Sequence, residues 1–372
     1  MSLQELCVPV LGQSVNNAGI ITVSSYEDFD LVTADAFVLG YLEDRNSNNS
    51  GASEAAAAIR NALYKLHSVS KPMRIYDLGD CKLGATIAES YANLKDCVSQ
   101  LMIYGKPILI FGGTQEAVCA VAELGFHRIA YPAVCFVDAR VDWESETTDF
   151  SNTNYLSRLH LEHPRARVLH VASQEYLSSR EAFLWLNEHN FGLLRLGECN
   201  SSVSLAESLI RDAQIVSFDM GAVRYSDNPA GQNVNGLYSE FACQCAWYAG
   251  YSPRMNLFCL SEYNPSNDLD SISAQLSAQV LWHALDGVSQ RKNETMDFED
   301  ETYQKRYLKH PMFPQDICFY QSLVSQTMWV EIPIGTTGKK RIVPCHSTDY
   351  EQFRNGIVPE LWMTEFRRLA TL

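Results

Sequence analysis

The chain has no long basic run and no long apolar run, and this excludes several classes of protein. Its 372 residues carry 29 Lys and Arg against 44 Asp and Glu, and its sharpest basic run is Lys339–Arg341. Binding to nucleic acid or to an anionic membrane depends on Lys and Arg that neutralise phosphates, so a net charge of −15 argues against both. No stretch offers about 18 consecutive apolar residues, so we expect no transmembrane helix.

The sequence also lacks a secretory signal and any Cys-x-x-Cys pair. Residues 1–30 have neither a basic start nor a continuous apolar stretch. The eleven cysteines are scattered; Cys243 and Cys245 form a Cys-x-Cys, which we interpret as two buried helix positions in preference to a thiol or metal pair. Reduced thiols without a signal predict a cytoplasmic protein.

Apolar runs alternate with helix-like segments over most of the chain. Eight β-branched or aromatic runs are Ala36–Tyr41, Met73–Tyr76, Pro107–Phe111, Ala133–Asp138, Val168–Ala172, Gly192–Leu196, Ile215–Asp219 and Met255–Leu260. The helix candidates between them are Ser53–His67, Leu83–Tyr104, Glu116–Leu124, Gln174–Asn190, Ser204–Asp212, Ser239–Ala249 and Asp270–Gln290. Short runs that are apolar on both faces are typical of a parallel sheet covered on both sides. The alternation predicts a doubly wound α/β sheet.

The alternation ends near residue 297. Three extended runs and two short helices follow, at Cys318–Ser322, Met328–Ile332, Arg341–Pro344, Tyr350–Asn355 and Glu360–Leu369. The segment Gly335–Gly338 would turn the second run back onto the third. We therefore predict a main domain over residues 1–296 and a C-terminal extension, residues 297–372, that packs on it.

Polar side chains stand at the ends of three predicted strands. Asp138, Arg140 and Asp142 lie at positions i, i+2 and i+4, so an extended chain projects them to one side. Gln115 follows the third run and Asp219 ends the seventh. Ligand sites in open α/β sheets form at the carboxyl ends of strands, so we expect these side chains to meet. Close carboxylates repel each other unless a cation lies between them, which suggests a cation site.

The order of these motifs resembles that of the ureohydrolase family of arginases, agmatinases and formimidoylglutamases. The segments that carry the resemblance are Gly40–Asp44, Ala58–Arg60, Asp77–Asp80, Gly112–Glu116, Asp138–Asp142, Ser217–Gly221, Gly236–Glu240 and Glu262–Pro265. The resemblance covers residues 34–290. It implies a three-layer α/β/α sandwich on a mainly parallel eight-stranded sheet, and often a homo-oligomer. It also implies two manganese ions, held by side chains at positions 115, 138, 140, 142, 219 and 221.

Three of those six positions depart from the family's ligands. Gln115 and Arg140 stand where the family has His, and Gly221 stands where it has Asp. A protonated guanidinium has no lone pair to offer a metal, so we expect no pair of ions and no required cofactor. At most one weakly held ion would lie between Gln115 and the three aspartates. We predict instead that the Arg140 guanidinium occupies the former metal cavity and pairs with at least one aspartate.

Four further features have two interpretations each. Arg224, in the loop after Asp219, either joins this ion cluster or lies on a solvated loop. Glu240 matches the family's substrate-binding glutamate only with a one-residue offset. We interpret Glu262–Pro265 as a strand-to-loop turn in preference to a ligand contact, and His160 with His163 as a helix end before Pro164 in preference to a metal pair.

Together these features predict a non-catalytic family member that binds a small cationic or amidine-bearing ligand, or a protein partner. Amidine hydrolysis requires a hydroxide, which paired metals generate by lowering the pKa of bound water, so missing ligands argue against it. One alternative is an active amidine hydrolase of the formimidoylglutamase or agmatinase type with a single or altered manganese centre. Another is a purely structural subunit of an oligomer.

Overall fold

Ten strands form the main sheet of the computed structural model, which describes residues 2–10, 16–23, 26, 30–145, 150–313, 315–335 and 338–370. The strands are β1 (Cys7–Val8), β2 (Ile20–Thr22), β3 (Ala36–Gly40), β4 (Ile75–Cys81), β5 (Ile108–Phe111), β6 (Ala133–Val137), β7 (Arg167–Ser173), β8 (Gly192–Arg195), β9 (Ile215–Asp219) and β10 (Leu257–Ser261). Their order is β1-β4-β3-β5-β10-β9-β6-β7-β8, with β2 also beside β4. Only β1 pairs antiparallel among these described strands. The eight predicted strands are confirmed as β3 to β10, and the short β1 and β2 extend the sheet from eight strands to ten.

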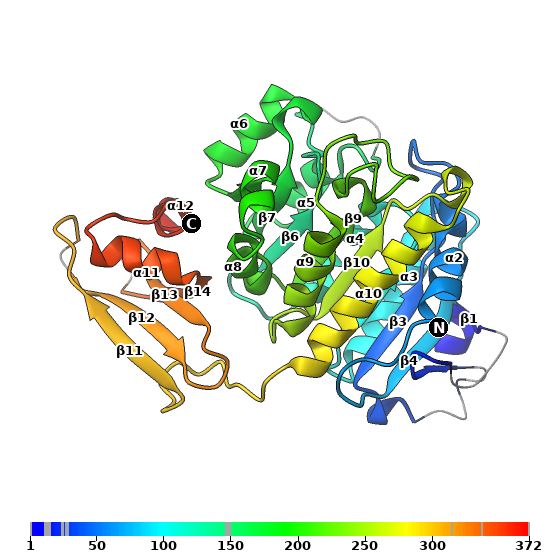
Figure 1. The fold of residues 1–372 in the computed structure, drawn as a ribbon, viewed down its shortest axis with the longest axis horizontal. Helices are drawn as coiled ribbons and strands as arrows, with labels where there is room; N and C mark the ends of the chain where they lie inside the picture. The colour runs from blue at the N-terminus through cyan, green and yellow to red at the C-terminus, as the bar shows by residue number, and fades with distance from the viewer. Residues whose placement is uncertain are drawn as a thin grey trace.

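Helices cover both faces of this sheet (Figure 1). One layer contains α2 (Ala55–Leu63), α7 (Leu196–Ser201), α8 (Leu205–Asp212), α9 (Ser239–Tyr251) and α10 (Ile272–Gln290). The other contains α3 (Ile87–Met102), α4 (Val118–Gly125), α5 (Tyr155–Glu162) and α6 (Arg180–Glu188), with α1 (Leu3–Leu6) against α3. The predicted three-layer α/β/α sandwich is therefore confirmed. No helix that the structure describes is long and apolar enough to cross a membrane.

Alternate residues of each strand supply the two cores. Val38 and Phe111 face the layer of α2, α9 and α10, whereas Phe37 and Ile110 face the layer of α3 and α4. Every residue of β3, β5, β6 and β10 is buried. This explains why the sequence runs are continuously apolar, because a parallel strand covered on both faces has no side that meets water.

A second, antiparallel sheet forms the C-terminal part of the chain. It contains β11 (Tyr303–Leu308), β12 (Ile317–Ser322), β13 (Met328–Pro333) and β14 (Lys340–Cys345), followed by α11 (Ser347–Arg354) and α12 (Glu360–Ala370). The three predicted runs are confirmed as β12 to β14, whereas β11 was not predicted. Thr336 and Thr337 of the predicted turn lie outside the described residues. The last helix on the main sheet ends at Gln290, and the first strand of the second sheet begins at Tyr303. The predicted domain boundary at residue 296 lies between them and stays a prediction.

A buried network of charges joins this extension to the main domain. Two carboxylates, Asp212 of α8 and Glu365 of α12, are surrounded by the guanidinium groups of Arg167, Arg254, Arg341 and Arg368. Arg167 of β7 lies 3.0 Å from both carboxylates. Burial alone would raise the pKa of both carboxyls, but the guanidinium groups outweigh it and lower the pKa of each.

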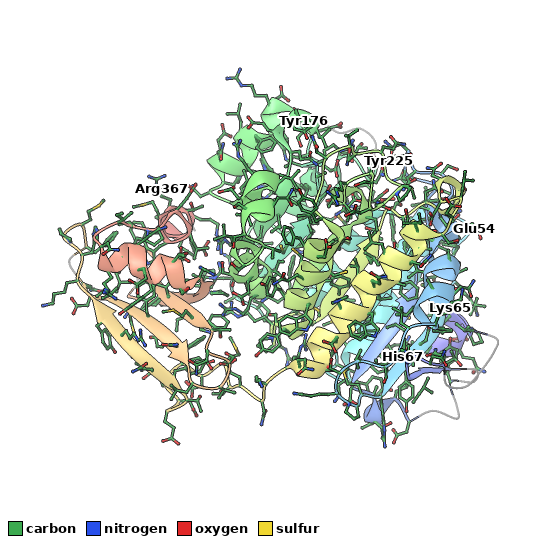
Figure 2. All side chains as sticks on the ribbon, in the orientation of Figure 1. Glu54, Lys65, His67, Tyr176, Tyr225 and Arg367 are labelled. Carbon is green, nitrogen blue, oxygen red and sulfur yellow. The ribbon has the colours of Figure 1, made fainter. Side chains whose placement is uncertain are left out.

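The loops at the carboxyl ends of the parallel strands gather at one end of the molecule. Tyr176, which follows β7, and Tyr225, which follows β9, lie exposed at this end (Figure 2). Asn235 of the β9 loop donates a hydrogen bond to the Tyr176 hydroxyl at 3.3 Å. The two loops therefore touch, and they border the candidate site described below.

We predict that Glu365→Gln lowers the free energy of unfolding by about 3–5 kcal/mol, because it leaves buried guanidinium groups without their counter-charge. Urea denaturation of the full chain measures this. Glu360→Gln is the matched control, since Glu360 is exposed at the start of the same helix, and it should change the free energy by less than about 0.5 kcal/mol.

Acid titration gives a second measure of the same network. Both carboxyl pKa values are lowered in the folded state, so the network's contribution is fully present above the ordinary carboxyl pKa of about 4. It is lost as the pH falls from there towards the folded-state values. Glu365→Gln should therefore lose less stability than the parent chain between about pH 5 and pH 2; an equal loss in the two proteins would contradict the assignment.

Candidate ligand pocket at the carboxyl edge of the sheet

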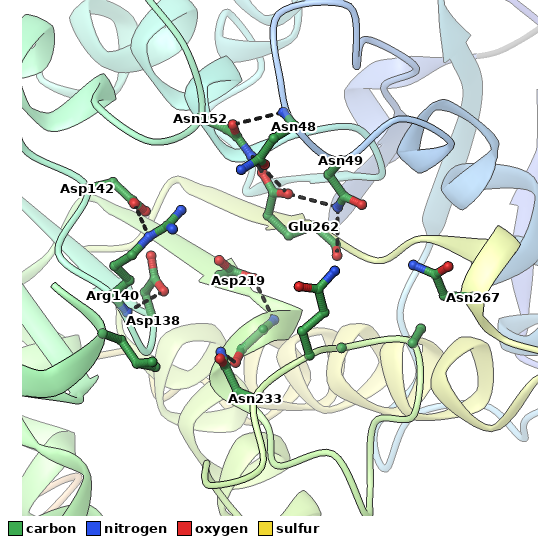
Figure 3. Close-up of a pocket in the computed structure, with 15 residues that line it drawn as sticks. Asn48, Asn49, Asp138, Arg140, Asp142, Asn152, Asp219, Asn233, Glu262 and Asn267 are labelled. Atoms are coloured by element: carbon green, nitrogen blue, oxygen red, sulfur yellow. Dashed lines mark hydrogen bonds and ion pairs between the residues drawn. The ribbon is translucent and has the colours of Figure 1, made fainter.

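Loops after β3, β6, β9 and β10 enclose a polar cavity of about 310 Å³ (Figure 3). Its charged side chains are those of Asp138, Arg140, Asp142, Asp219 and Glu262. Its amide side chains are those of Asn48, Asn49, Asn152, Gln232, Asn233 and Asn267. The pocket thus combines four carboxyl groups, one guanidinium and a set of amides.

The aspartates are held by the turns that end β6 and β9. Asp138 accepts a hydrogen bond from the backbone N–H of Arg140 at 2.9 Å, and Asp219 accepts one from that of Gly221 at 2.5 Å. Each carboxylate bonds two residues ahead, which is the usual role of Asp in a turn. Asp138 and Asp142 are only 2% and 3% exposed, so water screens them poorly.

Arg140 pairs with Asp142 in this pocket. The Arg140 Nε lies 2.5 Å from Asp142 Oδ1, so the expected pairing of the guanidinium with an aspartate is present. The Arg140 side chain is 41% exposed, however, whereas Asp142 is 3% exposed. The guanidinium therefore approaches the carboxylates from the mouth of the cavity and not from a sealed interior.

The pKa values of these carboxyls are raised in spite of the arginine. Burial, and then the charge of Asp142, raise the pKa of Asp138 well above its ordinary value. Burial raises the pKa of Asp142 to about 7, with Arg140 opposing the shift and Asp219 adding to it. Burial and the nearby Asp138 likewise raise the pKa of Asp219. One guanidinium does not balance these groups, so the pocket favours a further positive charge.

Glu262 is a pocket residue that the sequence interpretation did not assign to the site. It was expected to be a turn residue, yet it lines the pocket directly after β10. Its φ of 66° is left-handed, which a side chain other than Gly rarely adopts. Three groups hold its carboxylate: the backbone N–H of Gln115 at 2.8 Å, the amide of Asn49 at 2.9 Å and that of Asn152 at 3.2 Å. A strained backbone fixed by three donors is typical of a functional position.

The amides come from the loops after β3, β6, β9 and β10, and none of these amide residues was predicted to belong to a site. Asn152 donates to Asn48 at 3.1 Å as well as to Glu262, so it links the loop after β6 with the loop after β3. Asn233 donates to the Gly221 carbonyl at 2.7 Å and closes the pocket from the β9 loop. Asn48 and Asn49 belong to the polar run Asn46–Gly51, and the amide content of that run is the signal that the sequence offers for this wall.

Two candidate residues, Arg224 and Glu240, do not line the pocket. Arg224 turns away, pairing with Asp227 at 2.9 Å and lying 4.1 Å from the Tyr238 ring centroid. Glu240 is exposed on α9 and lines a separate groove between α9 and α10. Arg224 has the carboxylate of Asp227 three positions ahead of it, and Glu240 lies on the face of α9 that lines the other groove.

Gln115 and Gly221, two positions of the ligand set that the resemblance implies, have different environments. Gly221 lines the pocket. Gln115 is buried behind Glu262, and its Nε2 donates to Ser217 Oγ at 3.2 Å. Gln115 Oε1 and Asp138 Oδ2 are buried, and no hydrogen-bond donor among the described residues reaches either atom. Of these two residues only Asp138 lines the pocket, so its Oδ2 is the acceptor that a donor-bearing ligand in the pocket would satisfy.

The remaining metal-like pairs form no such site. Cys243 and Cys245 are buried on α9, and α5 ends at Glu162, just before His163 and Pro164, as interpreted from the sequence. Within the described part of the chain, no group of three or more His, Cys, Asp or Glu side chains is arranged to hold a metal ion.

Comparison with known proteins identifies relatives of this architecture. The family model described as "Arginase family" matches residues 34–286. A formimidoylglutamase of Staphylococcus epidermidis is 23% identical over 266 residues, which span 67% of this chain and 85% of the relative. One from Staphylococcus aureus is 21% identical over the same share of each chain.

Solved structures have the same fold. Trypanosoma cruzi formiminoglutamase with Mn²⁺ has a TM-score of 0.66 at 20% identity and covers 75% of this chain and 100% of its own. Bacillus subtilis formimidoylglutamase has a TM-score of 0.62 at 20% identity and covers 78% of this chain and 92% of its own. The C-terminal sheet lies beyond the matched family region, which ends at residue 286.

We predict that Arg140→Ala lowers the free energy of unfolding by about 1–2 kcal/mol, below the usual cost of breaking a buried pair because the guanidinium is partly solvated. Chemical denaturation measures the loss. Arg354→Ala is the control, since Arg354 pairs with Glu351 where both side chains are more than half exposed, and it should be close to neutral. Equal effects of the two changes would contradict the role of the buried Asp142.

Proposed function

Since the chain belongs to the arginase family, we propose that it is a member that does not hydrolyse amidines and that uses its pocket to bind a small cationic ligand. An amidinium or guanidinium group is the chemistry that suits this pocket. The proposal depends on one observation above all: Arg140 pairs with Asp142 inside the pocket where the family resemblance implies metal.

A manganese pair does not fit the side chains that are present. Arg140 and Gly221 offer no lone pair where the resemblance implies a His and an Asp, and Gln115 offers only one weak oxygen. A divalent ion would also lie beside the Arg140 guanidinium, which repels it. Asp142 already uses one oxygen for that arginine. The chain therefore lacks the donor set that would generate a bound hydroxide.

A planar organic cation fits the same pocket better. Four carboxyl groups face one guanidinium, so three negative charges remain uncompensated when all four carboxylates ionise. Asp138 Oδ2 awaits a donor, and an amidinium offers several N–H donors in one plane. The amides of Asn48 and Asn233 supply neutral polar contacts at the mouth, where the rest of a small ligand would lie.

The alternative is an active hydrolase of linear amidines with a single or altered metal centre. It is supported by the relatives, which carry the names formimidoylglutamase and agmatine ureohydrolase. It requires Asp138, Asp142 and Asp219 to release Arg140 and take up an ion. The two proposals therefore differ in what occupies the aspartates.

Burial of all eleven cysteines as free thiols supports a reducing compartment such as the cytoplasm, which we propose as the location. The homo-oligomer implied by the family resemblance is likewise a proposal.

Turnover and metal content test the main proposal directly. Protein purified after manganese supplementation should hold less than one equivalent of manganese. It should release no urea, ammonia or formamide from arginine, agmatine or formimidoylglutamate, because no hydroxide is generated. Two equivalents of manganese with turnover of about 1 per second or more would establish the hydrolase instead.

The triple change Gln115→His, Arg140→His and Gly221→Asp is the positive control for metal binding. A Cβ at Gly221 would come no closer than 3.0 Å to another atom, that of Asp219 Oδ1, so the backbone accepts a side chain with a small adjustment. We expect the triple variant to bind manganese measurably. Turnover is not required, because its substrate contacts are unchanged from this chain.

Ligand binding has its own prediction. Methylguanidinium should bind the parent chain in isothermal titration, and Asp219→Asn should weaken it by about tenfold or more, since it removes a charge-assisted hydrogen bond. Methylurea, which is similar in shape but neutral, serves as the control ligand and should bind far more weakly. Equal affinity for the two ligands would exclude charge as the basis of recognition.

A further inference from the structure

A second cavity, separate from the central pocket, lies on the outer surface of α9 and α10. These two helices lie side by side in the layer that faces the viewer in Figure 1. Six α9 residues line the groove, namely Ser239, Glu240, Cys243, Gln244, Trp247 and Tyr248, and four α10 residues face them, namely Gln279, Trp282, His283 and Asp286. Both sets follow the i, i+3, i+4, i+7 spacing of one helix face. The volume of about 660 Å³ is within the range of small-molecule sites.

Close packing fixes the two walls of this groove. A Cβ added to Gly250 would come within 1.9 Å of the Ala284 carbonyl oxygen, and one added to Gly287 within 2.4 Å of the Trp247 carbonyl oxygen. The two glycines therefore let the helix backbones touch at the end where Trp247 and Asp286 meet. Tyr251 stacks on Trp247 with ring centroids 4.8 Å apart, which holds the indole in place.

The polar atoms of the aromatic side chains are already used within the protein. The indole N–H of Trp247 donates to Asp286 at 3.1 Å, and that of Trp282 donates to the carbonyl of His67, which Figure 2 labels, at 2.7 Å. The Tyr248 hydroxyl accepts from Gln244 at 2.7 Å. The two indole rings therefore offer their carbon surfaces and π-electrons to the groove, and not hydrogen-bond donors.

The groove is acidic and has no internal counter-charge. Glu240 and Asp286 both line it, and among the described lining residues there is no Lys or Arg. Neither carboxylate forms an ion pair with a described residue, although Asp286 is buried and accepts from the Ser70 N–H at 2.7 Å. Glu240 lies seven residues, or about 10 Å, before Trp247 along α9, so the aromatic rings lie between two negative charges.

We propose that this groove binds a small alkylated ammonium ion, with the cation over the rings of Trp247, Tyr248 and Trp282. Aromatic faces attract a cation through their negative quadrupole, and the carboxylates add long-range attraction. An ammonium whose hydrogens are replaced by methyl groups suits these walls best, because the walls offer π surface and charge but few free hydrogen-bond partners. The site is independent of the central pocket and of its proposed function.

Choline and its neutral isostere 3,3-dimethylbutan-1-ol form the test pair, followed by tryptophan fluorescence and ligand-observed NMR on the full chain. Choline should bind saturably and about tenfold or more tighter than the alcohol. Trp282→Leu should weaken choline by about tenfold, and Glu240→Gln by about threefold. If Trp282→Leu does not fold, Tyr248→Leu tests the same ring contact.

Two further variants make the result specific. Glu181→Gln is the matched control for Glu240→Gln, because Glu181 is exposed in the first turn of α6 as Glu240 is in that of α9; it should leave choline binding unchanged. Asp219→Asn should weaken methylguanidinium and not choline, which separates this groove from the central pocket. The proposal is overturned if choline fails to bind, if the alcohol binds equally well, or if Glu240→Gln and Glu181→Gln behave alike.

Discussion

The convergence of buried carboxyl groups at one edge of a parallel sheet is the constraint on which the rest of this site depends. Parallel strands bring Asp138, Asp219 and Glu262 to the same edge whether or not a cation is present. Like charges in a poorly hydrated cavity repel, so either protons, metal ions or guanidinium groups must neutralise them. Here the Arg140 guanidinium, which pairs with Asp142, supplies one positive charge. The raised pKa values of the carboxyls indicate that one positive charge is too few.

The strands of the main sheet could be predicted because their burial leaves a direct trace in the sequence. A strand covered on both faces is continuously apolar, as Ala133–Val137 is. The strands that were missed lack this trace. Tyr303–Leu308 is an edge strand that pairs only with β12 among the described strands. Most of its side chains are partly or fully exposed, so polar residues such as Lys305 and Arg306 are tolerated there. Cys7–Val8 is too short to show any period.

The site was predictable only where local spacing determines the geometry. Asp138, Arg140 and Asp142 are close in sequence and all line the pocket, although β6 ends at Val137 and a turn, not the expected extended chain, brings them there. Glu262 depends on a left-handed residue and on donors from three distant segments, none of which its neighbours encode. Arg224 failed as a candidate for the opposite reason, because a local partner, Asp227, was available three residues away.

The same physical rule produces two different results within this chain. Around Asp212 and Glu365, four guanidinium groups surround two carboxylates, and the carboxyl pKa values fall in spite of burial. In the pocket, four carboxyls face one guanidinium, and the pKa values rise. An arginine-rich cluster of this kind needs nothing from solution and can join two parts of a fold permanently. A carboxylate-rich cavity with an open mouth retains an unmet demand for positive charge, and a ligand can meet it reversibly. The direction of the pKa shift therefore separates the charge network that holds this protein together from the one that is available to bind.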